Sequence, residues 1–283
     1  MGKRTENRGR VLEKKKKILK RIVAVFGVLV LLAAVLATAM LLYVKKYYKS
    51  DVTMIDAIVE IMDGSVNSYA DSDSMVFVPS DHNIKAMIIF YPGGKVEYTA
   101  YSTLMYRLAD RGYLCVLLKM PGNLAFLDMD AAAETLEKQY DRLSMIQDVD
   151  WYIMGHSLGG VAASSYLEGV LNGDKPTYHG RGPEGEYRGI IFCGSYTAED
   201  YTDNDIRLLS IYGTEDGVLN REAYEASKEL WPEDSAEYII HGGNHANFGS
   251  YGEQEGDGTA TLTCEQQQDY TAALVDEWIY TGN

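Results

Sequence analysis

One serine lies at the centre of a turn that suits nucleophilic chemistry. An apolar segment, Trp151-Tyr152-Ile153-Met154, runs into Gly155-His156-Ser157-Leu158-Gly159-Gly160, a G-x-S-x-G pattern centred on Ser157. Such a turn between a strand and a helix exposes a serine hydroxyl, and its glycines avoid contacts that a Cβ would make. A chain with 27 glycines can contain the pattern by chance. Its interpretation therefore depends on the residues that could assist the serine.

A serine hydroxyl needs a general base and an acid that orients the base. A predicted strand over residues 207–212 is followed by Gly213-Thr214-Glu215-Asp216-Gly217. A carboxylate in this loop would lie at the carboxyl end of a strand, where doubly wound sheets bind ligands. We predict Asp216 as the acid, because the glycine after it lets the loop turn, and Glu215 is the alternative.

Two histidines compete for the role of base. The predicted strand 236–241 ends at His241, and the loop beyond it reads Gly242-Gly243-Asn244-His245-Ala246-Asn247. His241 is still in the register of the strand, whereas His245 can reach across the strand ends from its glycine-rich loop. We therefore predict His245 as the base. The chain order is serine, then acid, then base, which differs from the trypsin-like and subtilisin-like orders.

Backbone N–H groups are the candidate donors for an oxyanion. The N–H of Leu158 begins the helix after the serine, where the helix dipole also favours negative charge. A second N–H is expected from Tyr91-Pro92-Gly93-Gly94-Lys95, which follows a predicted strand over residues 86–91. Both Gly93 and Gly94 are candidates at this stage. A phosphate-binding loop is not indicated, because the rest of that motif is missing.

Further residues at the same edge could shape a substrate pocket. The segment Lys119-Met120-Pro121-Gly122-Asn123-Leu124-Ala125-Phe126 follows a predicted strand over residues 113–118. It is either a pocket wall containing Asn123 and Leu124 or a loop packed by its own apolar side chains. His156 is expected to shape the site rather than to act as base. No insertion long enough for a cap domain is evident, so the site is expected to be shallow and open.

Short apolar strands alternate with amphipathic helices along residues 75–283, which predicts an α/β fold with a mostly parallel, doubly wound sheet. Leu136, Tyr140, Leu143 and Ile146 make one apolar stripe, and a surface loop is expected over residues 173–189. About seven strands are predicted, over residues 75–78, 86–91, 113–118, 150–154, 189–193, 207–212 and 236–241. The predicted helices cover residues 98–110, 131–146, 158–171, 221–230 and 266–280.

The first fifty residues predict a membrane anchor. Residues 1–21 hold ten basic and two acidic side chains, and residues 22–44 are uncharged. A helix of this length spans roughly 34 Å, enough for a bilayer core of about 30 Å. The basic excess predicts a cytoplasmic tail over residues 1–21, a transmembrane signal-anchor helix over 22–44 and an extracytoplasmic remainder. Ala37-Thr38-Ala39 leaves a cleaved signal peptide as the alternative. Residues 45–74 are predicted as a juxtamembrane stalk and residues 75–283 as the catalytic domain.

Charge and cysteine content narrow the possible partners. Residues 51–283 contain 13 basic and 39 acidic side chains, a net charge of −26. So acidic a domain argues against binding nucleic acid. Three cysteines give no even disulfide framework, and no His/Cys spacing indicates a metal site. We expect no metal and no cofactor.

Five segments together resemble a known family. They are Y-P-G-G-K-V-E at 91–97, L-L-K-M-P-G-N-L-A-F at 117–126, G-H-S-L-G-G at 155–160, Y-G-T-E-D-G-V at 212–218 and G-G-N-H-A-N-F-G-S-Y-G at 242–252. The chain from about Met75 onward resembles the bacterial "alpha/beta hydrolase fold-5" group of the α/β-hydrolase superfamily, which is related in fold to dienelactone hydrolases. The resemblance implies Ser157 as nucleophile, Asp216 as acid and His245 as base. Dienelactone hydrolases use a cysteine nucleophile where this chain has Ser157, so their substrate class does not carry over. The resemblance therefore implies hydrolysis without naming a substrate.

These observations predict a membrane-anchored extracytoplasmic serine hydrolase acting on carboxylic esters, with a small-molecule or lipid-like substrate. One alternative is an amidase or acyltransferase acting on envelope or lipid material. Another is a catalytically inactive binding module attached to the membrane. The sequence makes no prediction of the oligomeric state.

Overall fold

The computed structural model describes residues 2–139, 149–175 and 187–281, and it divides into two units, Met1–Lys46 and Tyr47–Asn283. The first unit is one helix, α1 (Gly2–Lys45). An 18-residue stretch within its segment Leu19–Lys45 has a mean hydropathy of 2.9, and the segment is long and apolar enough to cross a membrane. A signal sequence near the N-terminus can meet the same criteria of length and composition. This helix is therefore a candidate membrane anchor.

The second unit is built on one sheet of eight strands in the order β1-β2-β4-β3-β5-β6-β7-β8. β1 and β2 pair antiparallel to their neighbours, and all the other pairs are parallel. This confirms the predicted mostly parallel α/β fold. The strands are β1 (Val66–Ala70), β2 (Ser74–Pro79), β3 (Ala86–Tyr91), β4 (Tyr113–Leu118), β5 (Asp150–His156), β6 (Tyr187–Cys193), β7 (Arg207–Gly213) and β8 (Ser235–Ile240).

Among the described residues, β1 is the one strand beyond the seven that were predicted. It lies, with the helix α2 before it, in the segment predicted as a stalk. α2 (Val52–Ile61) begins at Asp51, whose carboxylate accepts the N–H groups of Thr53 and Met54. Its Ile58 is buried in the core, and β1 then pairs with β2. The compact unit therefore begins at Tyr47 and not at Met75. β1 was missed because, of its five residues, only Val66 is buried, so it shows no apolar run.

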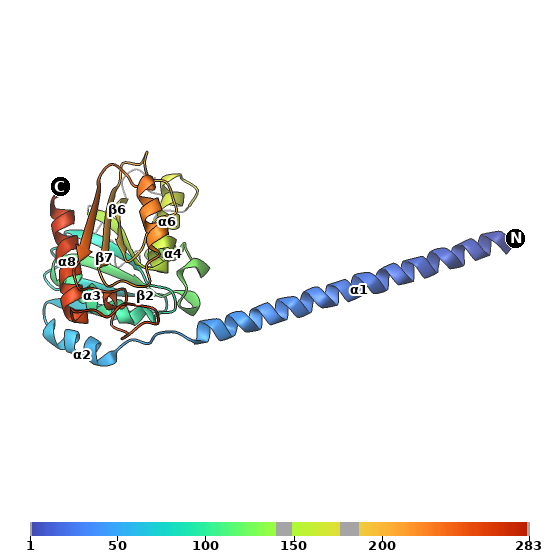
Figure 1. Cartoon of the computed structure of the whole chain (residues 1–283), viewed down its shortest axis with the longest axis horizontal. Helices are drawn as coiled ribbons and strands as arrows, with labels where there is room; N and C mark the ends of the chain where they lie inside the picture. The colour runs from blue at the N-terminus through green and yellow to red at the C-terminus, as the bar shows by residue number, and fades with distance from the viewer. Residues whose placement is uncertain (1, 140–148, 176–186, 282–283) are drawn as a thin grey trace. The chain divides into compact units, whose positions relative to one another are not determined.

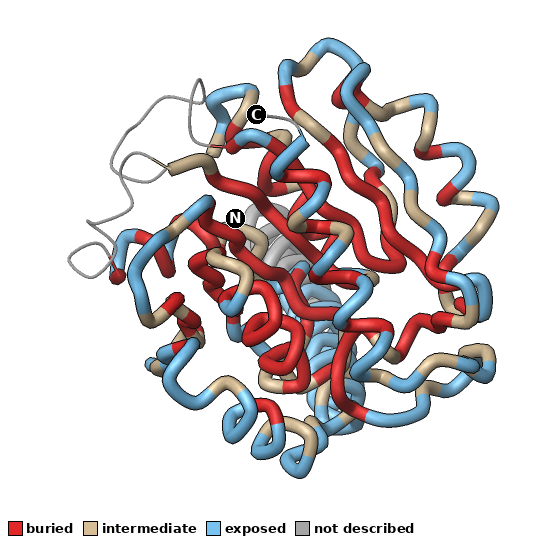
Figure 2. The backbone as a smooth tube through the Cα atoms, turned by 90° about the vertical axis from the view of Figure 1, so that its left-hand side faces the viewer, coloured by how far each residue is buried: buried red, intermediate tan, exposed pale blue. Residues whose placement is uncertain are grey.

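Helices cover both faces of the sheet (Figure 1). α3 (Ser102–Asp110) and α8 (Cys264–Thr281) pack together on one face, with α2 against α3. α4 (Ala131–Lys138) and α6 (Leu158–Leu171) cover the other face, and α7 (Arg221–Ser227) follows β7. Every residue of β3 and β4 is buried, which explains their continuous apolar sequences. Figure 2 shows that the buried residues, in red, gather in the central strands and the helices against them.

Two sequence predictions fall partly outside the described residues. The helix predicted over residues 131–146 is described only as α4, and Tyr140, Leu143 and Ile146 of the apolar stripe lie outside. Most of the loop predicted over residues 173–189 also lies outside, and β6 begins at Tyr187. Single-turn helices occupy several loops: η1 (Tyr98–Tyr101), η2 (Pro121–Asn123), η3 (Ala125–Leu127), η6 (Lys228–Leu230) and η7 (Ala246–Phe248).

Candidate active site

Strand register brings the predicted site residues to one edge of the sheet. Gly155 of β5 pairs with Tyr91 of β3 on one side and with Phe192 of β6 on the other. The loops that leave these carboxyl ends carry Gly93 and Gly94 after β3 and Ser157 after β5. Those after β7 and β8 carry Asp216 and His245. Residues far apart in sequence thus meet because parallel strands end at the same edge.

Ser157 occupies a strained backbone conformation between β5 and α6, with φ 52° and ψ −128°. L-residues rarely adopt this region, which is found mainly where surrounding structure enforces it. The flanking glycines permit the turn: a Cβ on Gly155 would lie 2.5 Å from the Cα of Gly160, and one on Gly159 would lie 2.3 Å from the carbonyl oxygens of Tyr91 and Pro92. The turn is also held by the Ser157 N–H, which donates to the Cys193 carbonyl at 3.0 Å.

Asp216 and His245 form a buried pair. The His245 Nδ1 lies 2.9 Å from Oδ2 of Asp216, and both side chains are almost fully buried. The other carboxylate oxygen accepts the backbone N–H groups of Val218 at 3.0 Å and Leu219 at 2.8 Å. A carboxylate only accepts hydrogen bonds, so Nδ1 of His245 is the protonated nitrogen and Nε2 is left as an acceptor.

The Nε2 atom of His245 is buried and has no hydrogen-bond partner among the described residues. It belongs to a residue that lines the same small cavity as Ser157. Buried polar atoms are normally paired. An unpaired acceptor at this position can take a proton from a group in the cavity or from the serine hydroxyl in its lining.

The two glycines after β3 differ in their hydrogen bonding. The Gly93 N–H donates to Oη of Tyr101 at 3.1 Å. Within the described residues no acceptor is found for the Gly94 N–H. Gly94 also lies against Leu158, since a Cβ on it would be 2.9 Å from Cδ2 of that side chain. Gly94 and the first residue of α6 therefore lie together at the site, whereas the Gly93 N–H is already engaged.

His156 links three parts of the site beneath Ser157. It is fully buried, its Nδ1 lies 2.8 Å from Oη of Tyr101 and its Nε2 lies 3.1 Å from the carbonyl oxygen of His245. Since a carbonyl only accepts, Nε2 carries the proton and the Tyr101 hydroxyl donates to Nδ1. A continuous hydrogen-bond chain therefore runs from Gly93 through Tyr101 and His156 to the backbone of His245. His156 positions the loops and is not placed to act as base.

This burial makes the stability of the fold depend on pH. Burial, with a smaller effect of the neighbouring His245, holds the pKa of His156 well below its ordinary value of 6.5. Below that pH the unfolded chain binds a proton that the folded protein does not, so stability decreases as the pH falls. From pH 7.5 to 5.0 this group alone costs at most about 2 kcal/mol, the limit set by the ordinary pKa of a histidine in the unfolded chain. We expect urea unfolding of wild type to lose more free energy over this range than His156→Gln does, by up to that amount. Equal losses in the two proteins would contradict the prediction.

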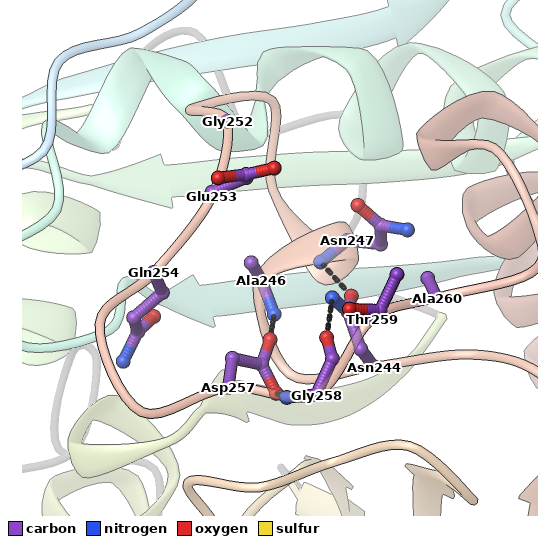
Figure 3. Close-up of a pocket in the computed structure, with 10 residues that line it drawn as sticks. All are labelled: Asn244, Ala246, Asn247, Gly252, Glu253, Gln254, Asp257, Gly258, Thr259 and Ala260. Atoms are coloured by element: carbon purple, nitrogen blue, oxygen red, sulfur yellow. Dashed lines mark hydrogen bonds between the residues drawn. The ribbon is translucent and has the colours of Figure 1, made fainter.

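Asp257 is a site residue that sequence reasoning missed. Its Oδ1 accepts the N–H groups of Gly217 at 3.0 Å and His245 at 3.2 Å, and its Oδ2 accepts that of Ala246 at 2.8 Å. Asp257 thus joins the loop of the acid to the loop of the base. It lies in the wall of a polar pocket of about 350 Å³ behind the base loop (Figure 3). An aspartate flanked by glycines is so common in turns that the sequence carries no signal for this role.

The cavity over Ser157 has a volume of about 180 Å³. Its lining is Ser157, Leu158, Val161, Gly194, Ser195, Tyr196, Val218, Leu219, Asn220 and His245. The predicted pocket residues His156, Asn123 and Leu124 are not among these ten lining residues. His156 and Leu124 are buried beneath the surface, and the Asn123 carbonyl accepts the Lys95 N–H at 2.7 Å. Val161, Tyr196 and Leu219, which come from α6 and from the loops after β6 and β7, supply apolar surface instead.

Cysteine is a poor candidate for the nucleophile in this chain. Cys193 lies at the end of β6, next to the site, but its side chain is fully buried. Burial raises the pKa of its thiol far above the usual range, and the same holds for Cys115. Because the thiolate is the reactive form, neither cysteine is activated. Among the residues described, no group of three or more His, Cys, Asp or Glu side chains is placed to hold a metal ion.

Comparison with known proteins agrees with this architecture. A model of the family described as "Alpha/beta hydrolase family" matches residues 87–269, which is more than half of the chain. The chain belongs to the alpha/beta hydrolase family. This confirms the resemblance noted in the sequence, and the matched region includes Ser157, Asp216 and His245. A search of curated proteins finds no match.

Solved structures resemble this alpha/beta hydrolase in fold. An esterase domain from a Rhodothermus marinus protein is 14% identical, with 75% of this chain and 97% of that chain covered and a TM-score of 0.50. A dienelactone hydrolase from Anabaena variabilis is 16% identical, with coverage of 77% and 98% and a TM-score of 0.49. A predicted CIB-like hydrolase from Thermoplasma acidophilum is 16% identical, with coverage of 75% and 99% and a TM-score of 0.47. At such identities the likeness concerns the fold alone.

Proposed function

We propose that this protein is a membrane-anchored serine hydrolase that cleaves carboxylic esters outside the cytoplasm through a Ser157–His245–Asp216 triad. One observation carries the proposal. The buried Nε2 of His245 has no hydrogen-bond partner among the described residues, His245 and Ser157 line the same cavity, and Nδ1 is fixed by Asp216. Buried polar atoms are normally paired, and a proton acceptor for Ser157 has to keep this nitrogen free.

The reaction follows from these positions. His245 Nε2 takes the proton of the Ser157 hydroxyl while Oγ forms a bond to the acyl carbon. The bond to the leaving oxygen then breaks, and His245 returns the proton to the departing alcohol. A water molecule gives its proton to His245 and adds to the acyl carbon, and Oγ of Ser157 leaves with the proton. The products are the carboxylic acid, the alcohol and free enzyme.

We assign the oxyanion donors to the N–H groups of Leu158 and Gly94. Gly94 is favoured over Gly93 because the Gly93 N–H is already hydrogen-bonded to Tyr101, whereas the Gly94 N–H has no acceptor among the described residues and Gly94 lies against Leu158. Preorganised backbone donors of this kind typically lower the barrier by about 3–4 kcal/mol each. The apolar surface of Val161 and Leu219 would then hold part of the substrate.

The anchor and its topology are part of the proposal. The support is the apolar length within Leu19–Lys45 together with the ten basic residues among residues 1–21, since an excess of Lys and Arg favours the cytoplasmic side. With that orientation the unit Tyr47–Asn283 lies on the opposite side of the membrane.

A fluorophosphonate probe tests the nucleophile directly. We expect covalent labelling of the wild-type protein at Ser157, found by mass spectrometry of the labelled peptide, and no labelling of Ser157→Ala. p-Nitrophenyl esters should be hydrolysed and the matching anilides should not, which separates an esterase from an amidase. Absence of labelling in the wild type, or equal labelling of both proteins, would refute the triad.

A further inference from the structure

The segment that follows the candidate anchor is bonded to the loop that carries Gly94. The Tyr48 N–H donates to the Lys95 carbonyl at 2.7 Å, and the Glu97 N–H donates to the Tyr48 carbonyl at 2.9 Å. Tyr48 and Val96 thus form a parallel β-bridge. We call residues 47–51 the strap.

Side chains fix the strap at several further points. The N–H and the hydroxyl of Ser50 both donate to Oε2 of Glu97 at 3.0 Å. The Asp51 N–H donates to the Ser250 carbonyl at 2.7 Å, and the ring of Tyr48 packs on that of Tyr251. Ser250 and Tyr251 follow the base loop, so the strap contacts both loops that flank Ser157. A segment bonded in this way is not a free linker.

We propose that the strap holds the active-site edge of the domain at the membrane surface, so that the substrate is an ester embedded in the bilayer. This rests on the proposed function and on the anchor. It follows from chain connectivity: only three residues separate Val44, the end of the uncharged stretch, from Tyr48, which makes four Cα–Cα steps. That length reaches at most about 14 Å, whereas a globular unit of this size is roughly 45 Å across. On this proposal the tether keeps Tyr48, and with it the active-site edge, within that reach of the end of the span, whereas it sets no such limit on the opposite edge.

Exposed apolar side chains occur next to the strap on this edge. The Lys95 carbonyl accepts the hydrogen bond from the strap, and the Lys95 N–H donates to the Asn123 carbonyl at 2.7 Å. The short helix η3 comes soon after Asn123 in the chain, and its Phe126 and Leu127 are 47% and 46% exposed. Leu158, in the cavity itself, is 36% exposed. These side chains can contact acyl chains at the interface.

Charge excludes simple electrostatic attraction as the cause of this placement. Residues 47–283 carry 14 basic and 39 acidic side chains, a net charge of −25, and such a unit is repelled by anionic lipid. Three lysines, Lys45, Lys46 and Lys49, lie at or beside the strap, but they are few against the acidic charge of the unit. A covalent tether and apolar contact are therefore required to keep the site at the bilayer.

A spacer variant tests the proposal in phosphatidylcholine vesicles that contain the full chain. About 20 Gly and Ser residues between Lys46 and Tyr47 keep the strap but add roughly 25 Å of reach. We expect hydrolysis of dioleoylglycerol in the same vesicles to fall at least about fivefold, because tethering sets the local concentration. Hydrolysis of soluble p-nitrophenyl butyrate should not change. An unchanged dioleoylglycerol rate in the spacer variant would overturn the proposal.

Surface substitutions provide a second comparison. Phe126→Ser combined with Leu127→Ser should also lower the dioleoylglycerol rate without affecting p-nitrophenyl butyrate. The matched control is Tyr280→Ser, because Tyr280 is 78% exposed and lies at the far end of α8. Equal effects of the two changes on the dioleoylglycerol rate would count against the proposal.

A measurement without catalysis separates this inference from the proposed function. A fluorophore on Phe126→Cys should be quenched by nitroxide-labelled lipid, whereas one on Asp110→Cys, at the opposite edge, should not. This result would support the membrane-facing edge even if neither ester were hydrolysed, an outcome that would refute only the esterase. Equal quenching at both positions, or a mature chain that begins after Ala39, would overturn the inference.

Discussion

Replacing Ser157 with alanine is expected to lower kcat/KM for a p-nitrophenyl ester by at least about 10⁴-fold and to leave the free energy of unfolding unchanged. Loss of the nucleophile removes the acyl-enzyme route, and the remaining rate comes only from the oxyanion donors and binding. Alanine keeps the Cβ and therefore the strained backbone of the turn, with φ 52°. Steady-state kinetics and urea unfolding of both proteins check the two parts. A loss below tenfold would exclude Ser157 as nucleophile.

Glycine at the same position separates chemistry from strain. Ser157→Gly should be as inactive as the alanine variant, because neither has a hydroxyl. It should unfold with about 1 kcal/mol more free energy than Ser157→Ala, since only glycine relaxes at positive φ. If the two variants were equally stable, the turn would store no strain. The matched pair thus tests whether holding the serine in this position lowers the free energy of unfolding.

The sequence was most informative about the candidate site where a residue suited to catalysis follows the end of a strand. Ser157, Asp216 and His245 each follow an apolar run, and parallel pairing brings such ends together whatever lies between them. The preference for His245 over His241 also agrees with burial, since His245 is buried beside Asp216 and His241 is exposed. Local patterns are informative here because a residue that follows a parallel strand in the sequence lies at the carboxyl edge of the sheet.

Prediction failed where a role depends on tertiary contacts. The sequence left Gly93 and Gly94 equivalent, and only the position of the Tyr101 hydroxyl distinguishes them. Asp257 acquires its role from four backbone N–H groups, three of them from the loops of the acid and the base. The strap was read as part of a stalk because its contacts are mostly backbone hydrogen bonds, which leave no apolar period.

Replacing Asp216 with asparagine is expected to lower kcat by roughly 10³–10⁴-fold while the protein stays folded. The asparagine oxygen can still accept the N–H groups of Val218 and Leu219, so the loop is retained. Its NH₂ group, however, faces Nδ1 of His245, which must then accept a hydrogen bond. The ring proton moves to Nε2, and that nitrogen can no longer take the proton of Ser157.

Glu215→Gln is the matched control for this substitution, because it makes the same chemical change one residue away. Glu215 is exposed, and its carboxylate accepts a hydrogen bond from the hydroxyl of Thr214 at 3.0 Å. We expect its kcat to stay within about twofold of wild type, as is usual for a surface side chain outside the site. Steady-state kinetics of both variants decide between the two acids that the sequence left open. A large loss in Glu215→Gln with little change in Asp216→Asn would reassign the acid. Equal losses would indicate that the loop, rather than one carboxylate, orients His245.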